Sequence, residues 1–461
     1  MASNESASPD RASWSGKWAF ILAGAASAVG LGNMWRFPYL AAKFGGGTFL
    51  LTYLVLVATF GLSLLLLETA LGRHTRQSVI GAFSHFGKKY IWIGILAAVV
   101  PFIITPYYCI IGGWVTKYMV AYITNGPAAL ADGGTFFTGF ISSNVESYVW
   151  MLIFMALVFF VVALGVQGGI EKANRIMMPA LIVMAVAIAI FTMTMPGALD
   201  GVAYYLVPDF SKFSPDLVIN ALGQMFYSLS LAMGIMVTYG SYMRRKDSLP
   251  NSVANIAGFD FGVSFLAGLM IVPAAYVAMG SAEAVAAKAG PSLMFITLPE
   301  VFNSMSPTIG TIIGFVFFLL VLFAALTSAI SLTEALVSIV ADGTGLSRRL
   351  SLIICMVFIV VVGIIVNAGY NVFSAVQPLG EGSTILDFFD FISNSVLMPI
   401  VAILTCIFVG WIVKPKVLVD EVKESSEFKA EKAWVVMVKY IAPLLVALIL
   451  ISNILPYIVG A

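Results

Sequence analysis

The chain of 461 residues is too apolar for a water-soluble protein, since 60% of its residues are hydrophobic and only 10% are charged, against about 25% charged residues in soluble domains. Its 24 Lys and Arg nearly balance its 23 Asp and Glu, so the net charge is only +1. Binding to nucleic acid needs a clear basic excess. We therefore expect an integral protein of the lipid bilayer that binds no nucleic acid.

Apolar stretches long enough to cross a bilayer recur along the chain. Each crossing needs roughly 20 mostly apolar residues, and a helix pairs all of its own backbone groups where water is absent. The sequence therefore predicts an all-α, polytopic membrane protein with eleven transmembrane helices. They are expected at 18–42, 47–71, 90–123, 148–166, 175–196, 217–242, 253–280, 308–341, 350–367, 386–413 and 435–459.

The basic residues predict how these spans are oriented. Short cytoplasmic loops retain Lys and Arg during insertion, and most of the basic residues share one side if the N-terminus is inside. The polar segment 1–17 lacks the apolar core of a signal peptide and is expected to be a cytoplasmic tail. The segment 414–434 is expected to be a cytoplasmic loop, and 435–461 to carry the eleventh span and an outward C-terminus.

One outer segment, 281–305, is too polar to span and is interrupted by Pro291 and Pro299. It is expected to form a bent amphipathic hairpin over the membrane domain. The alternative is a surface loop with no function.

Residues for hydrolytic or redox chemistry are scarce. Cys109, Cys355 and Cys406 are widely spaced in apolar runs, and the two histidines are His74 and His85. The chain contains neither an HExxH motif nor a GxSxG motif. We therefore expect no enzyme activity and no disulfide framework.

The first span is poorly suited to a continuous helix. Gly30 and Gly32 are followed at once by Asn33 and Arg36. Glycine costs about 1 kcal/mol relative to alanine inside a helix, and an arginine near mid-membrane costs about 2.5 to 3.5 kcal/mol on insertion scales. The sequence therefore predicts an interruption in this span.

The sixth span has a similar interruption, where Ser228, Ser230 and Gly234 stand inside an apolar stretch. Broken helices at matching positions of two halves indicate a transporter's central site, because unwound backbone leaves carbonyls and amides free for ligands. Small residues that only allow close helix packing are the alternative. Two polar interruptions, one beside Asn33 and Arg36, favour the site.

Further polar residues lie at membrane depth in other spans. Thr327 and Ser328 adjoin small residues in the eighth span, although such hydroxyls often only bond back to their own helix. Glu68 and Asp260 are ionisable, and ionisable residues at this depth mark a pathway or a buried polar network.

These motifs resemble those of the neurotransmitter:sodium symporter family, in particular its bacterial amino-acid transporters of the multi-hydrophobic amino-acid and leucine type. The resemblance covers residues 11 to about 456. It is carried by AVGLGNMWRFPY (28–39), FGGGTF (44–49), ETALGR (68–73), PYYCIIGGW (106–114), GQMFYSLSLAMG (223–234), KAGPSLMFITLPEVF (288–302) and ALTSAISLTE (325–334).

The resemblance implies a fold and a function. The core at 18–413 would hold two inverted five-helix repeats, spans 1–5 at about 18–196 and spans 6–10 at about 217–413, with helices 1 and 6 discontinuous. The protein would be a sodium-coupled symporter of the bacterial inner membrane that imports hydrophobic or aromatic L-amino acids by alternating access. The alternatives are a chloride-dependent amino-acid symporter of the same family and an ion channel.

The resemblance also implies two sodium sites. Counting from different landmarks places either Phe259 or Asp260 at the seventh-span ligand, and Asp260 is chosen because phenylalanine has no side-chain oxygen. The first site would use Ala28, Asn33, Ser228 and Asp260. The second would use Ala26, Val29, Ala324, Thr327 and Ser328.

The substrate should bring its own carboxylate, because Gly30 stands where monoamine transporters of the family carry an aspartate. That carboxylate would meet the first sodium, the Gly32 amide region and the Tyr108 hydroxyl. A flexible methionine in the pocket suits ligands of differing shape. The expected substrate-binding residues are Ser27, Ala28, Leu31, Gly32, Ile104, Tyr108, Tyr227, Ser228, Ser230, Met233, Ser328 and Leu332.

Chloride is not expected to be required. Ser264 stands where chloride-dependent relatives have a serine, and Tyr53, Gln224 and Ser228 would complete their chloride site. Asp260, however, already supplies the compensating negative charge.

Paired charges are expected to form the gates. The resemblance assigns Arg36 and Asp390 to the external pair, and Arg11 and Asp342 to the internal pair, assisted by Trp14 and Tyr242. In the fifth span, Gly169 and Pro179 resemble a family motif at which that helix unwinds, with a simple proline kink as the alternative. The preferred amino acid, sodium stoichiometry, proton counter-transport, oligomeric state and resting conformation stay open.

Overall fold

The computed structural model describes residues 12–281 and 292–459. Within these ranges, nine helical stretches are long and apolar enough to cross a membrane. They are Gly47–Thr75 (α3 Gly47–Leu56, η2 Val57–Gly61 and α4 Leu62–Thr75), Lys88–Thr124 (η3 Lys88–Tyr90 and α6 Ile91–Thr124), Glu146–Ala163 (α8), Val166–Met193 (η5 Val166–Glu171 and α9 Lys172–Met193), Leu249–Met279 (α13), Pro307–Thr344 (α16), Arg348–Tyr370 (α17 Arg348–Asn367 and η8 Ala368–Tyr370), Ile385–Val413 (α18 Ile385–Asp390, η9 Phe391–Leu397, α19 Met398–Ile407 and η10 Phe408–Val413) and Glu431–Tyr457 (α21 Glu431–Val436, η11 Met437–Ile441 and α22 Ala442–Val459).

Two further spans are broken, as predicted. In the first, α1 (Lys17–Ala28) is separated from η1 (Gly32–Arg36) and α2 (Phe37–Lys43), and the two parts are bent by 55°. In the sixth, α11 (Pro215–Ser228) and α12 (Ile235–Ser241) are separated by the non-helical residues 229–234. The nine stretches and the bent first pair give ten spans within the described ranges. The predicted eleven are reached when α11 and α12, which do not meet the same length criterion, are taken as one further crossing.

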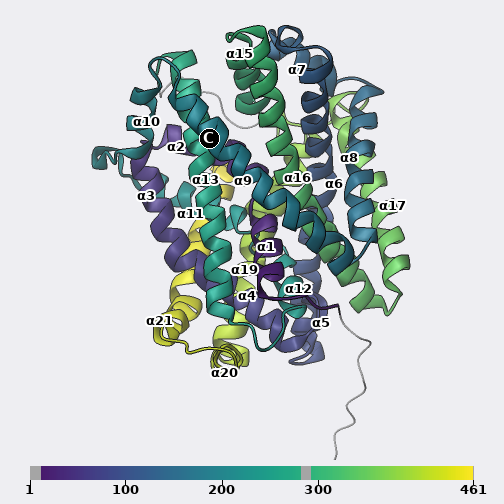
Figure 1. The fold of residues 1–461 in the computed structure, drawn as a ribbon. Coiled ribbons are helices and arrows are strands. Elements are labelled where there is room, and N and C mark those ends of the chain that lie inside the picture. The colour runs from purple at the N-terminus through teal and green to yellow at the C-terminus, as the bar shows by residue number, and fades with distance from the viewer. Residues whose placement is uncertain (1–11, 282–291, 460–461) are drawn as a thin grey trace, which may run out of the picture.

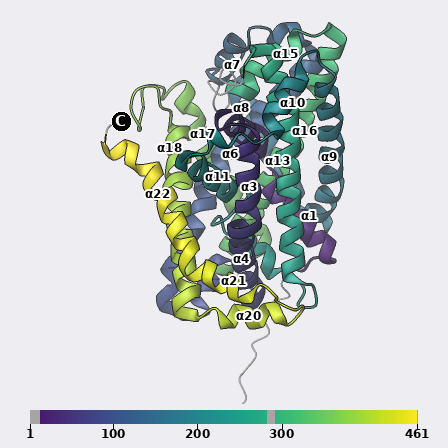
Figure 2. The same ribbon diagram turned by 90° about the vertical axis from the view of Figure 1, so that its left-hand side faces the viewer.

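The two ends of the described chain lie at opposite ends of the molecule, as an odd number of crossings requires (Figures 1 and 2). The chain begins at the lower end, and α22 climbs from the lower end toward the C-terminus at the upper end (Figure 2). The lower end also holds α20 (Lys416–Lys423) and α5 (Val79–Ser84). The upper end holds α7 (Gly133–Ile141), α10 (Ala198–Leu206) and α15 (Leu298–Asn303), with η4 (Pro127–Leu130), η6 (Phe210–Lys212) and η7 (Leu293–Thr297) in the same loops.

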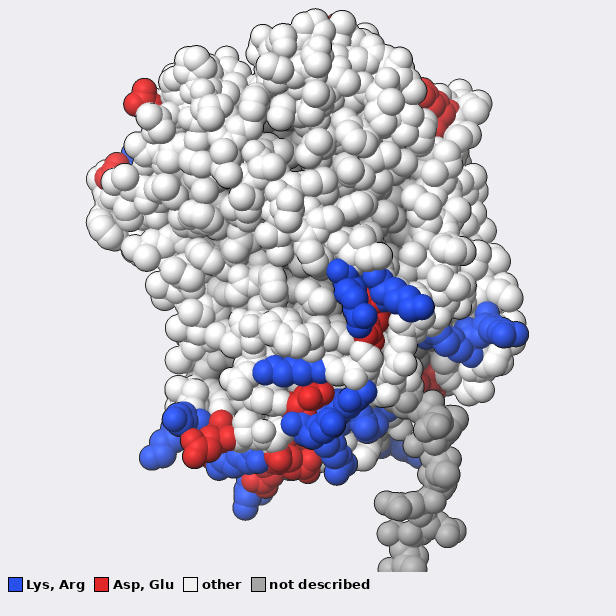
Figure 3. Space-filling view, in the orientation of Figure 1, with Lys and Arg blue, Asp and Glu red and all other residues white. Residues whose placement is uncertain are grey.

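Charge is distributed unevenly between these ends. In the face shown in Figure 3, Lys and Arg gather on the lower half, and the upper half is almost free of charge apart from a few acidic residues. This distribution is the one that basic cytoplasmic loops produce. It supports the prediction that the lower end faces the cytoplasm.

Glycine residues allow α4 of the second span and α12 of the broken sixth span to approach each other closely. A Cβ added to Gly72 of α4 would lie 1.9 Å from the carbonyl oxygen of Val237 in α12, and one added to Gly240 of α12 would lie 2.3 Å from the carbonyl oxygen of Thr69. Close backbone approach is how membrane helices associate tightly. Helices α4, α12, α13 and α1 form one packed group, and α6, α8, α16 and α17 form another, with α1 also contacting α16.

Three segments differ from their predicted boundaries or lie partly outside the residues that the structure describes. The fifth span begins at Val166, earlier than the predicted 175, and Glu171 and Arg175 pair with each other at 3.0 Å within it. The predicted loop 414–434 contains the helix α20. The predicted hairpin at 281–305 is described only from residue 292, where η7 and α15 form its second limb, and residues 282–291 lie outside the described ranges.

Candidate substrate and ion site

The break in the first span frees backbone groups at the centre of the molecule. Val29 is extended (φ −77°, ψ 102°), so α1 ends at Ala28. The Gly30 amide donates to Asn33 Oδ1 at 2.8 Å. In a continuous helix this amide would donate to the carbonyl of Ala26. The break therefore makes the Ala26 carbonyl available to another partner.

The break in the sixth span is held by unusual backbone and by a buried carboxylate. Ser230 and Ala232 have positive φ values of 53° and 59°, which L-residues rarely adopt. The Ala232 amide donates to Oε1 of the buried Glu68 at 2.7 Å. Glu68 thus has a structural function, because it satisfies a backbone donor that the interrupted helix leaves unpaired.

A cavity lies between the two breaks. All twelve residues predicted to bind substrate line it, from Ser27 to Leu332. Gly30, Asn33 and Ile235 complete the lining. Ile235 was not predicted, and its only signal in the sequence is that it directly follows Gly234, the last residue of the break.

One end of the cavity is polar and tightly built. The Leu31 amide donates to the Tyr108 hydroxyl at 3.3 Å. A Cβ at Gly30 would lie 2.7 Å from Ser328 Oγ and 2.9 Å from that hydroxyl. Glycine at position 30 is therefore required by the close approach of three elements, and it leaves the polar end open to a ligand.

Apolar side chains also line the cavity, namely those of Ile104, Met233, Ile235 and Leu332. Ser230 Oγ donates to the Ser27 carbonyl at 3.0 Å, so this hydroxyl is engaged with the protein. A ligand with both polar and apolar groups fits this lining.

An oxygen-rich cluster adjoins the cavity where the first sodium site was predicted. Asn33 Nδ2 donates to Ser228 Oγ at 2.9 Å and to Asp260 Oδ1 at 2.8 Å, and Ser228 Oγ donates to the same carboxylate oxygen at 2.6 Å. The other carboxylate oxygen accepts from the Tyr53 hydroxyl at 3.1 Å. Phe259 is half-buried against the apolar core, so the structure places Asp260 in the cluster.

The Asp260 carboxylate is fully buried, and no basic side chain within the described ranges forms an ion pair with it. A buried charge without a partner is unfavourable. A cation bound beside it would compensate this cost. Its neighbours are the Ser228 and Tyr53 hydroxyls and the Asn33 amide nitrogen, and carboxylate and hydroxyl oxygens suit a hard cation such as sodium.

A second group of oxygens lies between α1 and α16 at the predicted second sodium site. Ser328 Oγ donates to the Val29 carbonyl at 3.2 Å, and Thr327 Oγ1 donates to the Ala324 carbonyl at 3.0 Å. The freed Ala26 carbonyl belongs to the same break. All of these oxygens are neutral hydroxyl or carbonyl oxygens, which suit a monovalent cation such as sodium.

The residues of the predicted chloride set surround the same cluster. Ser264 Oγ accepts from Asn33 Nδ2 at 2.8 Å, and Gln224 Nε2 donates to the Gly32 carbonyl at 3.1 Å. Both side chains are fully buried. The Asp260 carboxylate already places a negative charge within hydrogen-bond reach of Asn33, which argues against a second anion there.

The predicted external gate residues line a second cavity on the outer side, but they are not in contact. Arg36 and Asp390 both border this cavity, and among the described residues Arg36 forms no ion pair within 4.0 Å. Its guanidinium lies 6.0 Å from the Tyr227 ring centroid, and Asp390 Oδ1 accepts from the Tyr107 hydroxyl at 3.1 Å. The predicted external pair is therefore not joined by an ion pair in this structure.

The inner path is closed by an aromatic plug. Trp14 is 1% exposed, its indole nitrogen donates to the Tyr239 carbonyl at 3.0 Å, and its amide donates to the Tyr242 carbonyl at 3.1 Å. Asp342 Oδ2 accepts from the Ser78 amide at 2.7 Å. Arg11, the predicted partner of Asp342, lies outside the described residues.

An ion pair between a buried glutamate and a half-buried arginine beside this plug was not predicted. Arg348 bonds both carboxylate oxygens of Glu334 at 2.8 and 2.6 Å, and the Tyr242 hydroxyl donates to the same group at 2.8 Å. The sequence showed Glu334 and Arg348 as separate charges, and only the packing of α16 against the start of α17 brings them together.

The sequence matches the Sodium:neurotransmitter symporter family over residues 11–129 and 141–459. A sodium-dependent transporter of Bacillus subtilis is 34% identical over 95% of this chain and 97% of its own. The taurine transporter of Rattus norvegicus, named as sodium- and chloride-dependent, is 28% identical over 68% of this chain and 58% of its own.

A crystal structure of MhsT in complex with L-phenylalanine is similar over 96% of this chain and 100% of that chain, with 35% identity and a TM-score of 0.85. The predicted fold class and family are thereby confirmed. These relatives are transporters, which agrees with the expectation that the chain is not an enzyme. The chain belongs to the sodium:neurotransmitter symporter family of polytopic membrane transporters.

Proposed function

We propose that the protein is a sodium-coupled symporter that imports hydrophobic or aromatic L-amino acids by alternating access. The observation that carries this proposal is the buried Asp260 carboxylate, which lacks a basic partner among the described residues and adjoins a cavity lined by both polar and apolar residues. The L-phenylalanine bound to the similar MhsT supports the substrate class.

Two sodium ions would be carried with each amino acid. The first would be held by Asp260, Asn33, Ser228 and the Ala28 carbonyl, with the substrate carboxylate as a further ligand. The second would be held by the Thr327 and Ser328 hydroxyls with three carbonyls, those of Ala26, Val29 and Ala324. A shared carboxylate couples the first ion to the substrate, because each improves the binding of the other.

Substrate recognition would follow from the two ends of the cavity. The Tyr108 hydroxyl and the Gly32 amide region would receive the carboxylate, and the carbonyls of both breaks would receive the ammonium group. Met233 and Leu332 would contact the side chain. Entry would be controlled by Arg36 and Asp390 outside, and exit by the Trp14 plug with Arg11 and Asp342.

The proposed location is the bacterial inner membrane, with the N-terminus inside and the C-terminus outside. The basic lower end seen in Figure 3 supports this orientation. The tail 1–17, the core 18–413, the loop 414–434 and the final segment 435–461 are the corresponding parts of the proposed architecture.

The proposal is tested by uptake of labelled L-phenylalanine into proteoliposomes. Accumulation is expected with an inward sodium gradient and not when potassium replaces sodium. A competition series with all twenty amino acids should rank hydrophobic and aromatic ones first. Uptake that is unchanged when potassium replaces sodium would contradict sodium coupling. Competition by small polar amino acids alone would contradict the proposed substrate class.

Chloride dependence is the second candidate, because the taurine transporter of rat is named as chloride-dependent. We propose independence, since Asp260 occupies the cluster that the chloride set surrounds. Uptake is expected to be unchanged when gluconate replaces chloride. A loss of uptake in gluconate would favour the chloride-dependent alternative.

A further inference from the structure

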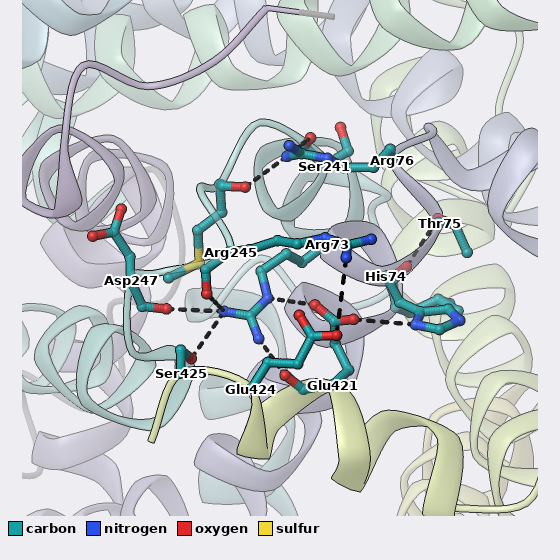
Figure 4. A network of polar contacts seen from close by, with 12 residues as sticks. Arg73, His74, Thr75, Arg76, Ser241, Arg245, Asp247, Glu421, Glu424 and Ser425 are labelled. Atoms are coloured by element: carbon teal, nitrogen blue, oxygen red, sulfur yellow. Dashed lines mark hydrogen bonds and ion pairs between the residues drawn. The ribbon is translucent and has the colours of Figure 1, made fainter. Parts of the chain in front are cut away.

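A buried arginine at the cytoplasmic end of α4 joins three segments that are far apart in the sequence (Figure 4). The side chain of Arg73 is 0% exposed, and its Nε donates to Glu421 Oε1 at 2.6 Å. Its Nη2 donates to the main-chain carbonyl of the same residue. Glu421 lies in α20, within the connection between the tenth and eleventh spans.

The remaining nitrogen of Arg73 contacts a second connection. Nη1 donates to the carbonyl of Asp247 at 2.9 Å, with the carbonyl of Arg245 at 3.4 Å, and to Ser425 Oγ at 3.1 Å. Residues 245 and 247 belong to the loop between α12 and α13. One guanidinium therefore fixes both this loop and the end of α20 to α4.

Helix α20 is docked on the molecule by its apolar side as well. Leu418, Val419 and Val422 are buried, and the side chain of Glu421 between them is 2% exposed. Burial alone would raise the pKa of Glu421, but the hydrogen bond with His74 and the ion pair with Arg73 outweigh it and hold that pKa below its ordinary value. Glu421 is therefore charged at neutral pH despite its burial.

The loop that Arg73 holds also contacts the plug of the inner path. The Arg244 Nε donates to the Trp14 carbonyl at 3.0 Å. Arg76 Nη1 donates to the carbonyls of Ser241 at 3.1 Å and Met243 at 2.6 Å, which fixes the start of the same loop to α4. A continuous series of contacts thus runs from Glu421 through Arg73 and the loop to Trp14.

We propose that Arg73 and Glu421 are positioning residues for closure of the inner path. By holding α20 and the loop after α12 against α4, the pair keeps Arg244 in place to retain Trp14. Loss of the Glu421 carboxylate removes the charged partner that fixes the Arg73 guanidinium, so the loop is held less firmly and Trp14 leaves its site more often. Transport would be affected through the balance between outward-facing and inward-facing states. The effect on transport rests on the proposed symport function, whereas the effect on the plug does not.

Lysine cannot replace Arg73 in this arrangement. Its single ammonium group cannot reach the carboxylate, two loop carbonyls and the Ser425 hydroxyl from the separate nitrogens that guanidinium provides. The chain also offers a matched control for Glu421. Glu424 lies one turn further along, is 44% exposed, and is 4.0 Å from Arg245, which is itself 63% exposed.

The test measures access to the inner path rather than uptake. A cysteine introduced by Ser331→Cys reports on the closed path, because Ser331 is fully buried and accepts from the Tyr239 hydroxyl at 2.8 Å beside the plug. Its labelling by a water-soluble maleimide is measured in purified protein. The parent protein, which keeps Ser331, gives the background labelling of the native cysteines.

Adding Glu421→Gln is expected to speed labelling at least fivefold, and Arg73→Lys should do the same, whereas Glu424→Gln should leave the rate unchanged. Ser425→Ala removes only one Arg73 contact and should give a smaller increase. This milder variant keeps the test decisive if the stronger variants do not fold.

Unchanged labelling in folded Glu421→Gln, or in Ser425→Ala if only that variant folds, would overturn the proposal. An equal increase in Glu424→Gln would also overturn it. Faster labelling in a protein that shows no sodium-driven uptake would instead refute the proposed function and leave the positioning pair intact.

Discussion

At the scale of single residues, the site depends on a few polar groups placed where the helices are interrupted. Asp260, Asn33 and Ser228 come from three different spans and meet through hydrogen bonds of 2.6 to 2.9 Å. Each of these residues could be selected from the sequence, because polar side chains are rare at membrane depth. Their mutual contacts could not be, because they depend on how the spans pack.

Removing the charge of Asp260 is the sharpest change at the first cation site. Asp260→Asn keeps the shape of the side chain. Contacts to charged groups contribute about 1.5 to 3 kcal/mol against about 0.5 to 1.5 kcal/mol for neutral ones, so the apparent sodium affinity should fall about tenfold. The sodium dependence of uptake measures this. Unaltered dependence in the folded variant would remove Asp260 from the site.

The hydroxyl of Thr327 can be tested with an isosteric substitution. Thr327→Val should weaken the apparent sodium affinity by roughly fivefold, because a buried oxygen ligand is replaced by a methyl group. Thr116→Val is the control, since Thr116 Oγ1 bonds the Gly112 carbonyl at 2.8 Å in another span. Equal sodium affinities in the two variants would contradict the assignment.

The lack of a side chain at Gly30 should be needed for substrate binding. Gly30→Ala places a methyl group 2.7 Å from Ser328 Oγ and 2.9 Å from the Tyr108 hydroxyl. Such a clash should weaken substrate affinity at least about tenfold, or roughly 1.4 kcal/mol. Scintillation-proximity binding measures it, with Gly258→Ala as the control because no atom lies within 4 Å there. Equal affinity in both variants would show that the polar end is not used.

At the scale of elements, the break in the sixth span depends on a neighbouring helix. Glu68 of α4 accepts from the Ala232 amide, which stands in left-handed backbone between α11 and α12. The sequence identified the break through its hydroxyls and glycine. It marked Glu68 only as a buried ionisable residue, because its partner is a backbone amide that no side-chain pattern reveals.

Two substitutions of Glu68 should distinguish its role as a hydrogen-bond acceptor from the role of its negative charge. Glu68→Gln retains an oxygen for the Ala232 amide and should keep most of the uptake, whereas Glu68→Leu leaves that amide unpaired, at a cost of about 1 to 3 kcal/mol. The leucine variant should therefore lose thermal stability and most uptake. Similar behaviour of the two variants would show that the charge, and not the acceptor, is needed.

The composition predicted the helix boundaries closely, except at the start of the fifth span, where charged residues were taken to lie outside the helix. The first span was expected at 18–42 and runs over 17–43, and the tenth was expected at 386–413 and runs over 385–413. The fifth was expected to begin at Arg175, after Lys172, yet the helical stretch begins at Val166 and includes both of them. Their long side chains keep the charged groups accessible while the helix continues.

At the scale of the whole molecule, eleven crossings and a basic lower end could be predicted because they follow from hydropathy and charge alone. Contacts between distant segments could not. Arg73 and Glu421 are 348 residues apart, and α20 lies in a segment that composition marks only as a loop. The amphipathic pattern of α20 can be interpreted only when α4 and the loop between α12 and α13 are known to form the surface on which this helix packs.

The two halves of the pathway are in different states. Arg36 and Asp390 border a cavity without forming an ion pair within the described residues, whereas Trp14 is buried by Tyr239 and Tyr242. The outer pair is thus not joined, whereas the inner plug is in place. Such asymmetry is what alternating access requires, since only one gate is open at a time.

The central claim is that sodium drives amino-acid uptake through the site between the two breaks. Its most direct test is accumulation of labelled L-phenylalanine in proteoliposomes with an inward sodium gradient, compared between the parent and Asp260→Asn. The account predicts concentrative uptake in the parent that is abolished in potassium, and a right-shifted sodium dependence in the variant. Sodium-independent uptake in the parent, or identical sodium curves for both proteins, would contradict it.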